Sequence, residues 1–316
     1  METEFVNCSA ENLYTVVNWL PSDLAADKVV FFPDACPSAA PLPTGVAVHI
    51  PRGKEWRKFA LSDIGCGMLL LESDIPNSEV YHCEQWNKEW DGLGLILKEN
   101  RNKLGDLGGG NHFLDAIVDY ETDKLSFLIH TGSRHESNSL DNYLDNPKEF
   151  GLEYERVTKW AANNRAAIGE FTEKVFGKCR KILDTAHNSY EILSDDSVII
   201  RKGVIRVNEG DLTVLPSSMN GDISLLRIKP SIKDVLNSIS HGTGRTMSRS
   251  EAKKFAESLD FQKLRSGIYI PEYIQDTSLR TEGPHCYRDL NSCLELLKSY
   301  AEEARRYAVV AYLGSL

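Results

Sequence analysis

The sequence lacks a long hydrophobic run. No stretch of about eighteen apolar residues occurs among the 316 residues, which excludes an ordinary membrane span. The opening residues, METEFVNCSAENLYTVVNWLP, also lack the basic start and apolar core of a secretory signal. Low-complexity tracts are absent as well, and 41% of the residues are hydrophobic, which is typical of a folded protein with a substantial core. We therefore expect a soluble, cytoplasmic protein with no membrane partner.

Cysteine is scarce, and its spacing excludes two common structural uses. The seven cysteines form no CxxC pair, so a structural zinc ribbon is not expected. They are an odd number spread over a long chain, unlike the disulfide framework of a short secreted domain. A cysteine with a functional role in this chain is therefore expected to act outside a zinc ribbon or a disulfide framework.

Net positive charge is also absent, because the chain carries a formal charge of −10. This balance argues against a protein that coats nucleic acid without specificity. One stretch differs: residues 201–254 hold ten basic and five acidic residues, a local charge of +5. Such a stretch can draw a single strand or a nucleotide into a cleft, although it can equally be an ordinary solvated face.

Short β-rich runs mix with helical segments in no regular βαβ order, and no repeat or linker divides the chain. Strands are expected at 45–50, 68–73, 124–133 and, as a pair, within 197–207. Helical periodicity covers 152–176, 291–312 and 251–259, the last with Ser250 as a plausible N-cap. This mixture predicts a single α+β domain spanning residues 1–316.

Histidine and cysteine recur beside glycine, asparagine or strand ends, where the backbone can approach a ligand closely. The segments are DIGCGM (63–68), LGGGNHF (107–113), HTGSR (130–134), AHN (186–188) and HGTGR (241–245). Any one of these histidines is more often a structural residue, but so many in such contexts indicate one site. Its members would be Asp63, Cys66, His112, His130, His187 and His241.

The donor types indicate a catalytic metal centre. Asp63 and Cys66 are three residues apart, so a tight turn can point a carboxylate and a thiolate into one cavity. A thiolate can bridge two metal ions, and histidines from separate segments would complete the two coordination shells. Ligands spread over the whole chain are typical of an open catalytic site. Softness of the donors alone favours zinc or iron over manganese.

At this point the chain resembles a known family. The segments GDLGGGNHFLDA, DIGCGM, IHTGSR, AHN, RKG, PSSM and SHGTGRTMSRSEA are together similar to the RtcB family of RNA ligases, and the likeness runs from about residue 33 to about 290. A short RtcB-like subgroup, sometimes found with a release-factor-like protein, is the nearer match. The resemblance implies mixed β-sheets flanked by helices around a central metal-containing cleft.

The resemblance also implies an activity. The family joins RNA ends that bear a 3′-phosphate or 2′,3′-cyclic phosphate to 5′-hydroxyl ends, in RNA repair or tRNA splicing, and uses GTP and two manganese ions. Five residues would hold the metals: Asp63, Cys66, His112, His130 and His187, with Cys66 bridging. His241 resembles the nucleophile that becomes guanylylated. A neutral imidazole can attack a phosphoryl group in this way.

The nucleotide pocket follows by the same likeness. Asn111, Asp115, Ser218 and Tyr287 fall at positions similar to the family's GMP contacts, as does Ser224 if Asn220 is a one-residue insertion. Arg245 could assist charge stabilisation on the phosphate. Asp115 replaces the usual glutamate and shortens the acceptor by one methylene.

Several positions depart from the family pattern. In the loop 33–45, Cys36 replaces a histidine, and Ser38 and Ala40 replace glycines. The segment 131–137 reads TGSRHES where SGSRGLG is usual. The chain ends in YLGSL and lacks the family's terminal Lys-Gly, whose lysine contacts the guanylate. The chain is also short, so RNA-binding insertions of the family are expected to be missing.

Two other functions remain open on the sequence. One is a metal-dependent phosphodiesterase that opens 2′,3′-cyclic phosphates without sealing and does not need His241. The other is a non-catalytic module that binds RNA ends. Because the basic stretch 201–254 contains His241, we expect it to form the RNA-facing wall, with Arg201, Lys202 and Arg206 contributing to RNA binding.

Overall fold

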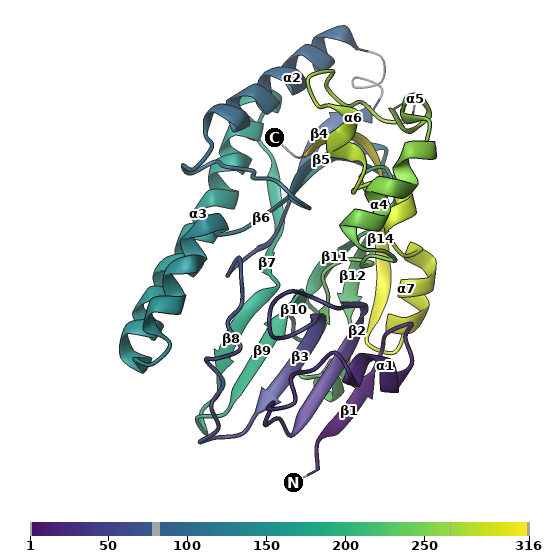
Figure 1. Cartoon of the computed structure of the whole chain (residues 1–316). Helices are drawn as coiled ribbons and strands as arrows, with labels where there is room; N and C mark the ends of the chain where they lie inside the picture. The colour runs from purple at the N-terminus through teal and green to yellow at the C-terminus, as the bar shows by residue number, and fades with distance from the viewer. Residues whose placement is uncertain (1, 78–82, 266, 315–316) are drawn as a thin grey trace.

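A computed structural model describes residues 2–77, 83–265 and 267–314 (Figure 1). Three β-sheets form its framework. The larger has seven strands in the order β11-β12-β14-β5-β6-β4-β7, a second has five in the order β1-β2-β3-β9-β8, and β10 pairs with β13. All pairings are antiparallel except that of β1 with β2.

The strands are, in chain order, β1 Glu4–Asn7, β2 Lys28–Cys36, β3 Thr44–Ile50, β4 Gly67–Pro76, β5 Phe113–Asp119, β6 Lys124–Thr131, β7 Arg180–Ala186, β8 Asn188–Ile192, β9 Val198–Lys202, β10 Val204–Arg206, β11 Leu212–Pro216, β12 Ile223–Ile228, β13 Ser238–Ser240 and β14 Ala301–Gly314. The α-helices are α1 Leu13–Val17, α2 Glu84–Glu99, α3 Pro147–Phe176, α4 Arg249–Phe255, α5 Phe261–Arg265, α6 Asp276–Leu279 and α7 Leu290–Leu297. Short 3₁₀ turns occur at Arg134–Tyr143, Pro230–Val235, Ala256–Ser258 and Pro284–Cys286.

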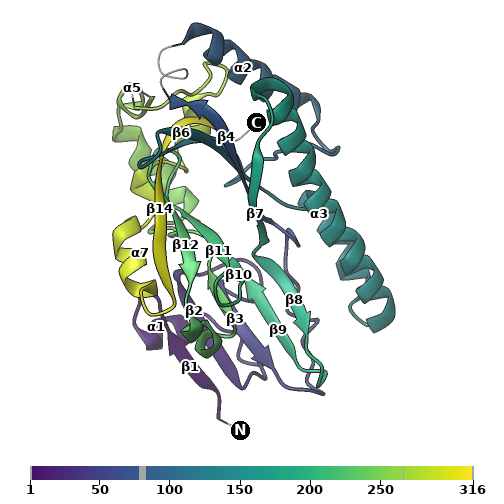
Figure 2. The ribbon, with the colours of Figure 1, turned by 180° about the vertical axis from the view of Figure 1, so that it is seen from behind.

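The expected α+β fold of mixed sheets with flanking helices is confirmed. The long helix α3 runs along one side of the molecule, and α7 and β14 lie on the other side (Figure 2), where Figure 1 also shows α4. The strands expected at 45–50, 68–73 and 124–133 are β3, β4 and β6. The two runs within 197–207 are β9 and β10, but they belong to different sheets because the chain changes partner between them.

Helix α3 confirms the helix expected at 152–176. Asn146 caps it by accepting a hydrogen bond from the backbone N–H of Glu149, and Pro147 occupies the first turn, where a missing N–H costs nothing. Its apolar stripe includes Val157, Ala161 and Ile168, all fully buried. The helix ends at Gly177, whose positive φ suits a residue without a Cβ.

The helix expected at 291–312 is wrong beyond its first turns. Helix α7 ends at Leu297, and the chain then forms the fourteen-residue strand β14. This strand lies between β12 and β5, so hydrogen bonding on both edges outweighs the helical spacing of its alanines and tyrosines. The expected N-cap of α4 is also wrong: Ser248, not Ser250, forms a capping box with Glu251.

No helix in the described residues is long and apolar enough to span a membrane. The core instead comprises three clusters of buried side chains. The largest packs the seven-stranded sheet against α2 and α3, with Trp90, Phe127 and Leu128 fully buried. The apolar run of β4 is therefore covered by neighbouring strands on both edges and by α3, which holds the start of β4 in a fixed position.

Candidate active site

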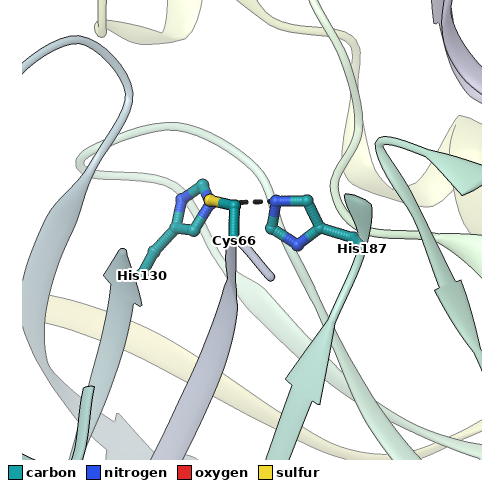
Figure 3. Close-up of side chains that lie close together, drawn as sticks. All are labelled: Cys66, His130 and His187. Atoms are coloured by element: carbon teal, nitrogen blue, oxygen red, sulfur yellow. Dashed lines mark hydrogen bonds between the residues drawn. The ribbon is translucent and has the colours of Figure 1, made fainter. Parts of the chain in front are cut away.

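The start of β4 brings three donor side chains together. Gly67, the first residue of β4, pairs with Thr131 at the end of β6 and with Ala186 at the end of β7. The residues beside these positions are Cys66, His130 and His187, and their side chains point toward one another (Figure 3). The backbone N–H of His187 also donates to the carbonyl of Cys66. Sheet register, rather than sequence distance, therefore assembles this cluster.

Cys66 belongs to two groups of donor atoms. One contains Cys66, His130 and His187, and the other contains Asp63, Cys66 and His112; within each group the atoms lie within 4.8 Å of one another. The Cys66 Sγ lies 3.2 Å from His112 Nε2 and 3.3 Å from His130 Nε2. Each group could hold a metal ion, and Cys66 offers its sulfur to both.

The turn before β4 positions Asp63. Asp63 adopts a left-handed conformation, with φ of 51°, and its carbonyl accepts from the Cys66 N–H. Its carboxylate accepts from the backbone N–H of Arg134 at 2.7 Å and lies 2.9 Å from His112 Nε2. A Cβ at Gly132 would sit 2.5 Å from the Asp63 Oδ1, so only glycine permits this approach.

Burial sets the protonation of the cluster. It lowers the pKa of His130 and His187 well below the ordinary value, so both imidazoles are neutral. Burial and the nearby Asp63 carboxylate raise the pKa of Cys66 well above its ordinary value. Burial opposes ionisation of Asp63, but His112 and Arg134 hold the pKa of this carboxyl below its usual range. Neutral imidazoles and one carboxylate are ready to bind a cation, whereas the Cys66 thiol must lose a proton.

His241 lies beside this cluster. Its ring centroid is 4.2 Å from that of His187, and its Nδ1 lies 2.7 Å from the Asp34 carboxylate and 2.6 Å from the carbonyl of Gly203. Both partners are acceptors, so the proton of a neutral ring resides on Nδ1 and Nε2 keeps its lone pair. The Asp34 side chain is 1% exposed and also accepts from Ser240 Oγ at 2.5 Å.

Asp34 was not singled out from the sequence, where it is only the second residue of the loop 33–45. In the structure it lies in β2, a strand that is mostly buried and ends two residues later at Cys36. A buried acidic residue at a strand end was the signal that could have identified it, because such a charge requires a partner.

All six residues line one cavity of about 920 Å³. Five residues expected to contact the nucleotide also line it: Asn111, Asp115, Ser218, Arg245 and Tyr287. The expectation for Ser224 is wrong. Its side chain is fully buried in β12, away from the cavity, and its hydroxyl donates to Glu303.

Glu282 joins two of these residues and was also missed. The Tyr287 hydroxyl donates to Glu282, whose other carboxylate oxygen lies 3.7 Å from Arg245 Nη1. The Arg245 guanidinium also lies over the Tyr287 ring, 5.1 Å from its centroid. The three side chains thus form a connected wall with one positive group. Glu282 lies in an ordinary-looking loop, so only the fold reveals this role.

The sequence of the chain is similar to those of known proteins. Residues 143–310, more than half of the chain, match the family model described as tRNA-splicing ligase RtcB. The chain belongs to the RtcB family. It is 28% identical to RNA-splicing ligase RtcB2 of Escherichia coli strain ATCC 25922, over 91% of this chain and 86% of that protein.

Other RtcB proteins match over less of their length. Identity is 24% with RNA-splicing ligase RtcB of Escherichia coli K12, over 63% of this chain and 58% of that protein. It is 25% with tRNA-splicing ligase RtcB of Nanoarchaeum equitans, over 63% of this chain and 56% of that protein. The chain therefore spans less than two thirds of these two RtcB relatives.

The loop that departs most from the RtcB pattern has its own contacts. Cys36 and Ser38 line the cavity. Ser38, at a position where the family pattern has glycine, accepts from Lys202 Nζ at 2.6 Å, and the carbonyl of Leu42 accepts from the same ammonium group. Burial lowers the pKa of Lys202 to about 8. One of the departures, Ser38, thus joins the loop to β9.

The expected RNA-facing wall is only partly supported. Lys202 lines the cavity, but Arg201 is wrong as an RNA contact because it is fully buried and pairs with Glu191. Arg206 pairs with the same glutamate and lines a separate groove. Arg201 and Lys202 differ because they are neighbours on β9, and neighbouring side chains of a strand point to opposite faces.

At the end of the chain, Ser315 and Leu316 lie outside the described residues.

Proposed function

We propose that this chain, acting as one catalytic domain of residues 1–316, is a GTP- and manganese-dependent RNA ligase. It would join a 3′-phosphate or 2′,3′-cyclic phosphate end to a 5′-hydroxyl end in RNA repair or tRNA splicing. The single observation that carries the proposal is the placement of His241, held through Nδ1 by Asp34, beside two donor groups that share Cys66. The names of its RtcB relatives, which are RNA-splicing and tRNA-splicing ligases, support the substrate class.

The residues fit a pair of metal ions. Asp63, Cys66 and His112 would hold one ion, and Cys66, His130 and His187 the other. The donor atoms lie close together, since His130 Nε2 is 3.3 Å from the Cys66 Sγ and 3.3 Å from His187 Nε2. Bound cations would neutralise charge on phosphoryl oxygens. The donor set by itself suits zinc or iron as well, and manganese is proposed from the family resemblance.

His241 is the proposed nucleophile. Its Nε2 lone pair would attack the α-phosphorus of GTP, forming an N–P bond as the bond to pyrophosphate breaks. The Asp34 carboxylate stabilises the positive charge that develops on the imidazole and keeps the ring oriented. Arg245, in the wall of the same cavity, supplies positive charge near the phosphates.

The same residue would then pass GMP to RNA. An oxygen of the RNA 3′-phosphate attacks the phosphorus, the N–P bond breaks, and His241 returns to its neutral form. The 5′-hydroxyl of the second end then attacks the activated 3′-phosphate, and GMP leaves as the phosphodiester forms. A 2′,3′-cyclic phosphate must first be opened by water.

The test is a covalent adduct. Wild-type protein incubated with manganese and α-labelled GTP should retain label in a bond that is labile in acid and stable in base. His241→Ala should lose the label, whereas His135→Ala should keep it, since His135 is exposed and outside the cavity. An unlabelled wild type, or full labelling of His241→Ala, would overturn the proposal. Opening of cyclic phosphates by His241→Ala without sealing would assign that step to the metal residues alone.

A further inference from the structure

Helix α3 carries a charged residue in the middle of its buried face. Arg165 follows Ala161 by four residues and precedes Ile168 by three, so it occupies a position of the buried stripe where an apolar side chain is expected. It is only 4% exposed. Its Nε donates to the Asp184 carboxylate at 2.7 Å. Burying a charge is costly even when it is paired, so this arginine indicates a role beyond packing.

The guanidinium also holds two backbone carbonyls beside the candidate metal ligands. Arg165 Nη1 donates to the carbonyl of Gly65 at 2.6 Å and to that of Thr131 at 3.3 Å. Gly65 directly precedes Cys66, and Thr131 directly follows His130. One planar group with donors in a fixed geometry therefore fixes the backbone beside the shared thiol and beside an imidazole of the same cluster.

The carboxylate that pairs with Arg165 belongs to a third segment of the cluster. Asp184 lies on β7, three residues before His187. The segments that Arg165 contacts are thus the ones that carry Cys66, His130 and His187, whose side chains Figure 3 shows together. Because Asp184 is negative, the pair as a whole adds no net positive charge next to a cation site.

The preceding residue of α3, Asn164, holds another part of the site. Its Oδ1 accepts from the backbone N–H groups of Gly105 and Asp106 at 2.8 and 3.0 Å, and its Nδ2 donates to the carbonyl of Asp106 at 2.8 Å. These two residues begin the glycine-rich segment that leads to His112. Two successive buried polar residues of α3 are therefore committed to the backbone of ligand-bearing segments.

We propose that Arg165 is a positioning residue of the metal centre, which sets the spacing of Cys66, His130 and His187 through the backbone of the segments that carry them. The inference rests on the proposed function for the presence of metal ions in this cluster. Residues that orient the ligands of a metal site without touching the ion typically change metal affinity by roughly 10- to 100-fold when they are replaced.

Charge and position make opposite predictions for Arg165→Gln. Removing a positive charge near two cations should by itself strengthen their binding. Removing the three-way contact should weaken it, because the ligands lose their fixed spacing. We expect manganese, titrated into the protein and followed by the electron paramagnetic resonance signal of the free ion, to bind about tenfold more weakly than in wild type.

Arg165→Lys is the second variant, and it keeps the charge next to Asp184. A single ammonium group lacks the fork that reaches all three partners, so manganese binding should again weaken by about tenfold. Near-ultraviolet circular dichroism of each variant shows whether its tertiary structure is retained.

Arg201→Gln is the matched control. Arg201 is also fully buried, pairs with Glu191 and donates to the carbonyl of Leu236, but it lines the separate groove. Its replacement should lower the stability of the fold and leave manganese affinity unchanged.

A second readout follows the metal–sulfur bond and does not depend on affinity. With cobalt at saturation, the charge-transfer absorption from thiolate to cobalt reports how the Cys66 sulfur meets the ion. This band should shift or weaken in both Arg165 variants and keep its wild-type form in Arg201→Gln.

The outcomes separate this inference from the ligase proposal. Unchanged or tighter manganese binding by Arg165→Gln, an equal loss in Arg201→Gln, a cobalt band identical to that of wild type, or a wild type that binds neither ion would overturn it. If wild type binds cobalt but not manganese, the manganese dependence in the proposed function fails and the cobalt titration decides the role of Arg165. If metal binding follows the expected pattern but no GTP adduct forms on His241, Arg165 keeps its role and the ligase mechanism fails.

Discussion

The Asp34 carboxylate lies 2.7 Å from His241 Nδ1, although 207 residues separate the two in the sequence. The carboxylate is buried, and its second oxygen accepts from Ser240. The pair fixes which ring nitrogen of His241 carries the proton. This relationship joins β2 to the residue that follows β13, and both residues line the cavity.

Asp34→Asn should therefore impair the nucleophile without removing it. The amide keeps the size of the side chain, but it cannot stabilise an imidazolium and can present N–H to Nδ1, which favours the wrong tautomer. We expect the rate of adduct formation with α-labelled GTP to fall by roughly 100-fold. Metal content measured on the same sample should be unchanged. A wild-type rate in Asp34→Asn would show that the contact does not orient His241.

Loss of a ligand that both donor groups share should remove more metal from the protein than loss of a ligand that belongs to one group. Because Cys66 belongs to both donor groups, Cys66→Ala should lose both manganese ions. His187 belongs to one group, so His187→Ala should keep one ion of two. Manganese per chain after dialysis, measured by mass spectrometry, tests this. Equal losses in the two variants would contradict separate sites bridged by sulfur.

The sequence predicted the residues of the site as a group, but it did not predict strand β14, which also lines the cavity. Each proposed histidine or cysteine ligand lies beside a glycine, an asparagine or a strand end, and these local signals can be read without knowledge of the fold. Asp34 and Tyr312 have no such signal, because their partners, His241 and Asp115, come from distant strands. The roles of the ligands and of His241 stay predictions, while their convergence on one cavity is a property of the structure.

Strand β14 shows why local pattern failed there. Its alanines and tyrosines continue the helical spacing of α7, and nothing in the sequence reveals that β12 and β5 leave a position between them. The misassigned strand carries Tyr312, so the error in secondary structure also hid a residue of the cavity. Arg201 was misassigned for a related reason, since charge counting ignores the face to which a strand directs each side chain.

Metal-free protein should lose stability in mild acid. The pKa values of His130 and His187 are lowered in the folded state, so both rings stay neutral while the unfolded chain takes up protons below about pH 6.5. Their contribution is therefore present above that pH and is lost as the pH falls. Each histidine should lower the unfolding free energy by up to about 1.4 kcal/mol per pH unit.

Urea unfolding between pH 6.5 and 5 would measure this slope. His187→Gln removes one of the two titrating rings and should therefore flatten the dependence. A variant slope identical to that of wild type would show that burial of His187 does not disfavour its charged form.

RNA binding should depend on the basic residues that line the cavity and not on the whole basic stretch. Arg249 lines the cavity and is exposed, whereas Arg206 is directed to another groove and pairs with Glu191. Arg249→Ala should weaken binding of a 3′-phosphorylated RNA and reduce the slope of log affinity against log salt by about 0.7 to 1, the effect of one lost phosphate contact. Arg206→Ala, the matched loss of one charge from the same stretch, should leave that slope unchanged.

Fluorescence anisotropy over a series of KCl concentrations distinguishes the two variants. Equal slopes for both variants would indicate that the stretch acts only through its total charge, and that the cavity is not where the phosphates of the RNA bind.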